Sequence, residues 1–61
     1  MKYAEKIKKL RNKLIMSQDE FAKLLGVSLA TVNRWEKGHH EPTIKQKRVL
    51  NKLFLENGME E

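Results

Sequence analysis

The sequence SQDEFAKLLGVSLATVNRWEKG, residues 17–38, contains two short helical patterns on either side of Gly26. Ser17 opens the first pattern and Ser28 opens the second. A serine at the start of a helix stabilises it, because its hydroxyl accepts a hydrogen bond from an otherwise unpaired backbone amide. A glycine can end a helix in the left-handed conformation at little cost. The stretch therefore predicts two helices joined by a tight turn.

The first of these helices carries an S-x-x-E capping box. The Ser17 hydroxyl can accept from the Glu20 amide, and the Glu20 carboxylate can accept from the Ser17 amide. The residues predicted to form the buried side of this helix are Phe21, Ala22, Leu24 and Leu25.

The second helix is predicted over residues 28–36. Val32 and Trp35 recur at a spacing of three, which places both on the side that faces the core. A tryptophan can also stack on a nucleobase in proteins that bind single strands, but this spacing favours the core for Trp35. Small or turn-forming residues at Ala22 and Gly26, with Val32 facing inward, suit a tight two-helix unit.

A helix precedes this unit over about residues 3–13. Apolar residues recur there at spacings of four, three and four, while lysines fill the opposite face. A basic amphipathic helix on a membrane surface is the alternative. The narrow apolar stripe and the apolar face that follows directly favour a core helix instead. Its inner residues are predicted to be Tyr3, Ile7, Leu10 and Leu14.

A further helix follows the unit. Pro42 disfavours helix at the residue before it, and Thr43 with Gln46 forms a T-x-x-Q capping box. The helix should end near residues 57–58. Its inner residues are predicted to be Ile44, Leu50, Leu53 and Phe54, with Val49 flanking them. Because no stretch alternates with period two, we predict an all-α bundle of four helices and no sheet.

The composition limits the kinds of protein that this sequence can encode. The 61 residues are 39% hydrophobic and 34% charged, which predicts one helical domain over residues 1–61. There is no cysteine, so no disulfide or thiolate metal site is expected. There is no long apolar segment, so we expect no membrane span and no secretory signal, and a cytoplasmic location.

No enzymatic chemistry is expected. The sequence has no cysteine nucleophile, no glycine-rich phosphate loop and no evident partnership of serine, histidine and carboxylate. His39 and His40 are adjacent, but two histidines without a carboxylate cluster make a weak metal site. We therefore expect no catalytic residue, no metal, no cofactor and no small-molecule ligand.

The charge distribution favours a polyanionic partner. The formal net charge is +5, and the basic residues concentrate in residues 1–13 and 37–52. The last residues are acidic. A basic balance on a small domain points first to nucleic acid and then to anionic membrane surfaces.

The sequence resembles the Cro and phage lambda-repressor-like regulators, the XRE family, over about residues 4–54. The resemblance lies in residues 17–38, in EKIKKLR at residues 5–11, and in EPT at residues 41–43. It implies a bundle of four or five helices whose third helix enters the major groove of double-stranded DNA. It also implies a transcriptional regulator, expected to be a repressor in a bacterial or phage-infected cell, that binds a two-fold-related operator as a homodimer.

The resemblance implies roles for individual residues. Gln18 matches a glutamine that touches phosphate and braces the recognition helix. Arg11 and Glu36 match two residues that form a buried or half-buried ion pair between the first helix and the end of the third. Thr31 is expected to contact a phosphate or a base, and Lys37 is expected to contact the DNA backbone. The matched base-reading positions are Ser28, Leu29, Ala30, Asn33 and Arg34.

The chemistry of these positions leaves two alternatives open. Arg34 suits bidentate binding to guanine and Asn33 suits adenine, but Arg34 can equally contact phosphate. Leu29 either meets thymine methyl groups or packs inward beside Val32.

A second class of function uses the same fold for protein interaction, as in an antitoxin or a recruiting domain. Phe54, Leu55 and Met59 lie near the end of the last predicted helix. Any of them left exposed would provide an apolar patch for a partner.

Overall fold

The computed structural model describes residues 2–59, and all regular secondary structure in that range is helical. The four helices are α1 (Lys2–Lys13), α2 (Gln18–Leu25), α3 (Leu29–Glu36) and α4 (Ile44–Glu56). The predicted all-α, four-helix fold is therefore confirmed. No helix in this range is long and apolar enough to cross a membrane.

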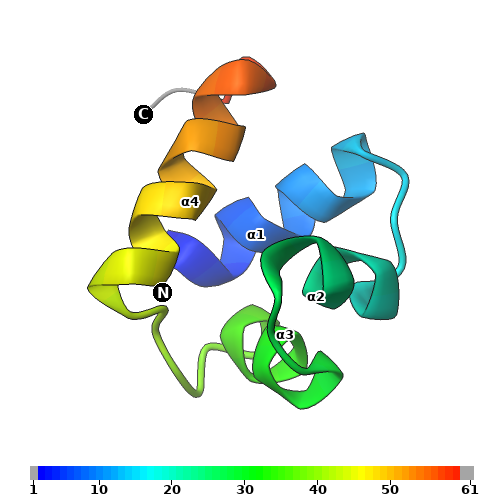
Figure 1. Cartoon of the computed structure of the whole chain (residues 1–61), viewed down its shortest axis with the longest axis vertical. Helices are drawn as coiled ribbons and strands as arrows, with labels where there is room; N and C mark the ends of the chain where they lie inside the picture. The colour runs from blue at the N-terminus through cyan, green and yellow to red at the C-terminus, as the bar shows by residue number, and fades with distance from the viewer. Residues whose placement is uncertain (1, 60–61) are drawn as a thin grey trace.

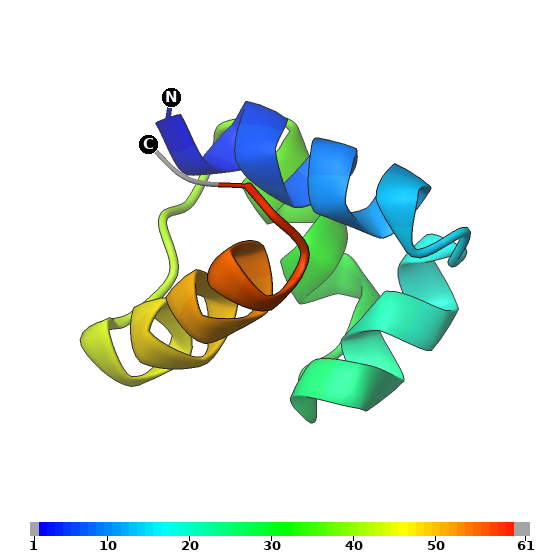
Figure 2. The same cartoon turned by 90° about the horizontal axis from the view of Figure 1, so that it is seen from above.

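Helix α3 lies at one end of the molecule, below α1 and α2 in Figure 1, and α4 runs up the left-hand side of the view. Figure 2 shows α2 and α4 diverging on opposite sides of the view. Helix α3 packs against both α1 and α2, and α4 packs against α1. Helix α1 therefore connects the α2–α3 unit to α4.

The core is formed by apolar side chains from all four helices. Ile7, Leu10, Phe21, Val32 and Leu50 have no exposed surface. These residues were predicted to face inward from their spacing. The other buried residues are Ala4, Ala22, Trp35, Pro42 and Phe54.

Two residues predicted to face inward are exposed, so those predictions were wrong. Leu24 is 50% exposed and Ile44 is 73% exposed. At 100° per residue, Ile44 lies about 120° around α4 from Leu50, so the face that packs on α1 excludes it. Leu24 is similarly about 100° from the centre of the buried side of α2.

The helix ends follow the predicted local chemistry. Ser17 and Glu20 form a complete capping box on α2, and Thr43 and Gln46 form one on α4. Gly26 ends α2 with φ 72°, in the left-handed region. The turn between α1 and α2 uses Ile15 at φ 56°, an uncommon conformation for a β-branched residue that the sequence did not indicate.

The junction of α1 with α4 centres on Phe54. The rings of Tyr3 and Phe54 lie 6.3 Å apart between centroids, and the Lys6 ammonium lies 4.5 Å from the Phe54 ring centroid. The Tyr3 hydroxyl donates to Asn51 Oδ1 at 3.2 Å. Phe54 is thus covered by an aromatic ring and a cation from α1.

Candidate nucleic-acid interface

The turn between α2 and α3 fixes the start of α3. The left-handed Gly26 reverses the chain, and the Val27 amide donates to the Ala22 carbonyl at 3.0 Å. The Ser28 hydroxyl then caps α3 by accepting from the Thr31 amide at 3.1 Å. This is the two-helix unit that the serines and Gly26 predicted.

The outer face of α3 is made by residues at helical spacing. Ala30, Arg34 and Lys37 are exposed, Leu29 is 47% exposed, and Asn33 is half-buried. Within residues 2–59 the side chains of Arg34 and Lys37 have no ion-pair partner. This outer face therefore has two apolar side chains in its first turn and polar or basic side chains in its second half.

The exposed fractions of Leu29 and Trp35 decide two of the alternatives that the sequence left open. Leu29 lies outside the core, with nearly half of its surface exposed, although Val32 one turn later is fully buried. Trp35 is 2% exposed and belongs to the core, so base stacking by this indole is excluded.

Ser28 and Thr31 use their hydroxyls within the protein. Their side-chain oxygens lie 2.9 Å apart and share a hydrogen bond, while Ser28 also caps α3. Thr31 is half-buried and Ser28 is exposed. Any further contact by these hydroxyls would use the hydrogen-bonding capacity that remains.

Gln18, the first residue of α2, joins α2 to α3 through its side chain. Its Nε2 donates to Glu36 Oε1 at 3.1 Å, and its Oε1 accepts from Asn33 Nδ2 at 3.3 Å. The expected bracing of α3 by Gln18 thus has a direct structural counterpart. The contact with Asn33 was missed, because the two residues are 15 positions apart and no local pattern relates them.

The ion pair between Arg11 and Glu36 links α1 to the end of α3, as the resemblance implied. Arg11 Nε and Nη2 donate to the two carboxylate oxygens at 2.7 and 3.1 Å. Arg11 Nη1 donates to the Met16 carbonyl at 3.0 Å, in the turn before α2. The side chains of Arg11 and Glu36 are only 17% and 4% exposed. One guanidinium therefore ties together α1, the turn and α3.

The protonation of this pair follows from its contacts. Burial raises the pKa of Glu36, but the hydrogen bonds from Arg11 and Gln18, with the positive charges of Arg11 and Lys8, outweigh it and leave a lowered pKa. The hydrogen bond to Glu36 raises the pKa of Arg11. The pair is therefore charged at neutral pH.

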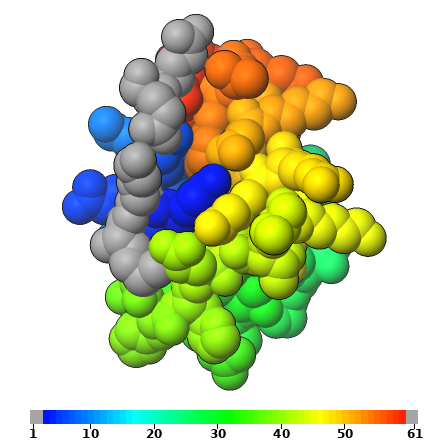
Figure 3. Space-filling view, turned by 90° about the vertical axis from the view of Figure 1, so that its left-hand side faces the viewer, coloured from blue at the N-terminus to red at the C-terminus, as the bar shows by residue number. Residues whose placement is uncertain are grey.

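Basic side chains continue from α3 onto α4. The loop after α3 and the first turns of α4 form one surface in Figure 3, where long side chains of α4 stand out from the body. His39, His40, Lys45 and Arg48 are exposed there. Among residues 2–59 no group of three histidine, cysteine, aspartate or glutamate side chains could hold a metal ion.

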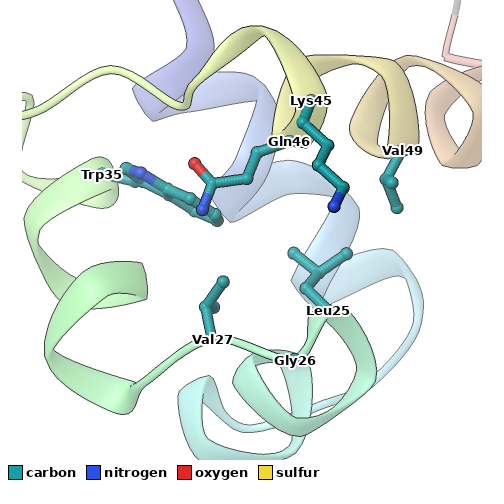
Figure 4. Close-up of a pocket in the computed structure, with 7 residues that line it drawn as sticks. All are labelled: Leu25, Gly26, Val27, Trp35, Lys45, Gln46 and Val49. Atoms are coloured by element: carbon teal, nitrogen blue, oxygen red, sulfur yellow. The ribbon is translucent and has the colours of Figure 1, made fainter.

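A small pocket of about 250 Å³ lies between the α2–α3 turn and α4. Figure 4 shows the Gln46 amide beside the Trp35 indole, with Val27 facing them from the turn and Leu25, the last residue of α2, lying below Lys45. The remaining lining residues are Gly26, Lys45 and Val49. Its walls are mostly apolar. Because the pocket separates them, α3 is packed less closely against α4 than against α1 and α2.

Comparison with known proteins agrees with this geometry. The family model described as helix-turn-helix matches residues 7–53, which include most of α1, all of α2 and α3, and most of α4. No curated protein and no solved structure matches significantly. The matched range covers most of the chain and contains the capped α2–α3 unit, its turn and the Arg11–Glu36 pair. The chain therefore belongs to the Cro and lambda-repressor-like (XRE) family of helix-turn-helix DNA-binding regulators.

Proposed function

We propose that the protein represses transcription by placing α3 in the major groove of double-stranded DNA. The observation that carries this proposal is the outer face of α3, where Asn33, Arg34 and Lys37 follow one another beside exposed Leu29 and Ala30. A major groove about 12 Å wide admits one helix, and its base edges are read by such side chains. The Arg11–Glu36 pair and Gln18 support the proposal by fixing the angle of this helix.

The proposed contacts divide by chemistry. Asn33 and Arg34 read base edges, and Leu29 and Ala30 meet apolar groups such as thymine methyls. Gln18 and Lys37 contact phosphates, which position the protein without reading sequence. Ser28 and Thr31 approach the backbone or bases with the hydrogen-bonding capacity left after capping.

The oligomeric state that we propose is a homodimer. We expect residues 1–61 to act as one domain that binds a two-fold-related operator as a homodimer in the cytoplasm. Selection from a random duplex library would give the half-site, its spacing and its symmetry together. Sedimentation with and without the selected duplex would give the stoichiometry; one protomer per duplex and an asymmetric site would refute the dimer.

The test of the interface is Arg34→Ala, measured on the selected duplex over a range of salt concentrations. Phosphate contacts release counterions, so the logarithm of the binding constant should fall linearly with the logarithm of salt concentration. Arg34→Ala should weaken binding by about 1–3 kcal/mol and relax the preference at one base position. The matched control is Lys9→Ala, which removes an equal charge from an exposed position on α1.

Three results would count against this assignment. Equal losses on selected and random duplexes would reassign Arg34 to phosphate contact. A salt-independent affinity would refute the proposed phosphate contacts. Equal effects of Arg34→Ala and Lys9→Ala would refute binding through the outer face of α3.

The protein-interaction alternative retains only part of the patch on which it rested. Phe54 is 2% exposed and Met59 is half-buried against the core, so of the three residues only Leu55, at 64%, is largely exposed. Stable self-association with no affinity for any duplex at low salt would favour the alternative.

A further inference from the structure

We propose that Glu36 is a positioning residue for base readout, because it sets, through Gln18, the orientation in which the Asn33 amide faces DNA. This inference rests on the proposed function, in which Asn33 lies at the major groove. The three side chains form one hydrogen-bonded series that begins at a buried charge and ends on the outer face of α3.

The series begins with a group that can only accept. The Glu36 side chain is 4% exposed, and its carboxylate receives hydrogen bonds from Arg11 and Gln18. An ionised carboxylate has no proton to donate. Its neighbours must therefore present N–H groups to it.

This requirement orients the Gln18 amide. With Nε2 at 3.1 Å from Glu36 Oε1, the carbonyl oxygen of the same amide is directed to Asn33. Rotating the amide by 180° would bring its carbonyl oxygen against the carboxylate. No proton would then lie between these two acceptors, although Arg11 would still donate to the carboxylate, and facing acceptors are costly in a partly buried site. The negative charge of Glu36 thus selects one of the two amide orientations of Gln18.

The orientation then passes to Asn33. Because Gln18 offers an acceptor, Asn33 directs Nδ2 toward it at 3.3 Å. Asn33 keeps Oδ1 and the second Nδ2 proton for other partners. An acceptor beside a donor matches the N6 amino group and N7 of adenine. A rotated amide would instead present its donors outward, which suits the N7 and O6 acceptors of guanine.

The test is Gln18→Met, which interrupts the series but leaves the Arg11–Glu36 ion pair in place. Affinity is measured on the selected duplex and on one with guanine replacing adenine at the position where Asn33→Ala abolishes the preference. We expect a preference of roughly tenfold in the parent to fall to about threefold or less. Any phosphate contact of Gln18 affects both duplexes equally, so the ratio isolates the amide orientation.

Matched variants separate this effect from a general loss. Gln46→Met removes a glutamine from the α4 capping box and should leave the ratio unchanged. Glu36→Gln should also lower the ratio, since a neutral amide accepts either orientation of Gln18. The preference at the Arg34 position should persist in Gln18→Met.

A second measurement uses the free protein. The Nδ2 proton that Asn33 shares with Gln18 should exchange slowly with water in the parent and rapidly in Gln18→Met, as observed by NMR of side-chain amides. An unchanged adenine preference in Gln18→Met, or unprotected Asn33 protons in the parent, would overturn the inference. A parent that binds no duplex would overturn the proposed function and the readout role together, and amide protection would then mark the series as purely structural.

Discussion

Helices α3 and α4 are attached to α1 in different ways. The junction of α1 with α3 adds directional polar contacts to the apolar core, because Arg11 holds Glu36 with two hydrogen bonds and also binds the Met16 carbonyl. The junction with α4 depends on the burial of Leu50 and Phe54, with Tyr3 and Lys6 against the Phe54 ring. The hydrophobic effect is non-directional, so apolar burial constrains the orientation of a helix less tightly than charged hydrogen bonds do. The buried directional contacts therefore lie at α3, the helix that we propose enters the major groove, whereas the Tyr3–Asn51 hydrogen bond between α1 and α4 is exposed.

The largest effect is expected at the apolar junction. Phe54→Ala should lower the free energy of unfolding by about 3–5 kcal/mol, because it leaves a cavity under a side chain that is 2% exposed. A chain of 61 residues has roughly 3–9 kcal/mol in total, so this variant can unfold outright. Phe54→Leu is the smaller change, expected to cost about 1–2 kcal/mol in urea unfolding.

The neighbouring residue provides the control for Phe54. Leu55 is 64% exposed, and Leu55→Ala should change stability by no more than about 0.5 kcal/mol. Equal losses from Phe54→Leu and Leu55→Ala would mean that the α1–α4 junction is not packed as described.

The polar junction should give the next largest effect. Arg11→Met leaves Glu36, whose side chain is 4% exposed in the parent, without its cation, at an expected cost of about 3 kcal/mol in thermal or urea unfolding. Lys23→Met removes a cation from the exposed pair with Asp19 and should cost less than about 0.5 kcal/mol.

The double variant Arg11→Met, Glu36→Leu sharpens this result. It should recover much of the lost stability while losing the orientation of α3, because an apolar pair can replace a buried ion pair in stability. If Arg11→Met and Lys23→Met cost the same, the burial of the pair has no energetic consequence.

The α2–α3 turn should give a smaller effect. Gly26 has φ 72°, and a Cβ added there meets nothing within 4 Å, so Gly26→Ala tests backbone strain alone. We expect a loss of about 1 kcal/mol, measured by thermal unfolding. Gly26→Asn should cost less, since asparagine tolerates the left-handed region better. A larger loss for asparagine would mean that strain is not the cause.

The pH dependence of stability should give the smallest effect. Because the pKa of Glu36 is lowered in the folded state, its stabilising contribution is complete above the ordinary value of 4.5 and is lost as pH falls through the lower, folded value. The parent should therefore lose stability on acidification more steeply than Glu36→Gln. Parallel curves for the parent and Glu36→Gln would contradict the lowered pKa.

Local chemistry explains what could be predicted from the sequence. Each capping box joins residues three positions apart, and Gly26 needs only its own backbone, so these features were predictable without tertiary contacts. Spacing identified the innermost residues, such as Ile7, Leu10 and Leu50. It failed for Leu24 and Ile44, because apolar residues at the edge of a helical face are buried only if a neighbouring helix reaches them.

The interface was predictable only in part. The positions assigned to base readout were carried over from the family resemblance. The structure adds the contacts and the burial of each side chain, which residue spacing does not encode. The Gln18–Asn33 contact depends on how α2 crosses α3, and the φ of Ile15 depends on how short the α1–α2 turn is. Both are results of tertiary packing, which no local pattern in this sequence specifies.

Trp35 has a practical consequence for the measurements of unfolding. It is the one tryptophan in the sequence, and its indole is buried beside the pocket between the α2–α3 turn and α4. Its fluorescence emission should shift to longer wavelength when water reaches the indole. The chain thus contains its own optical probe, placed where loosening of either junction changes the surroundings of a single chromophore.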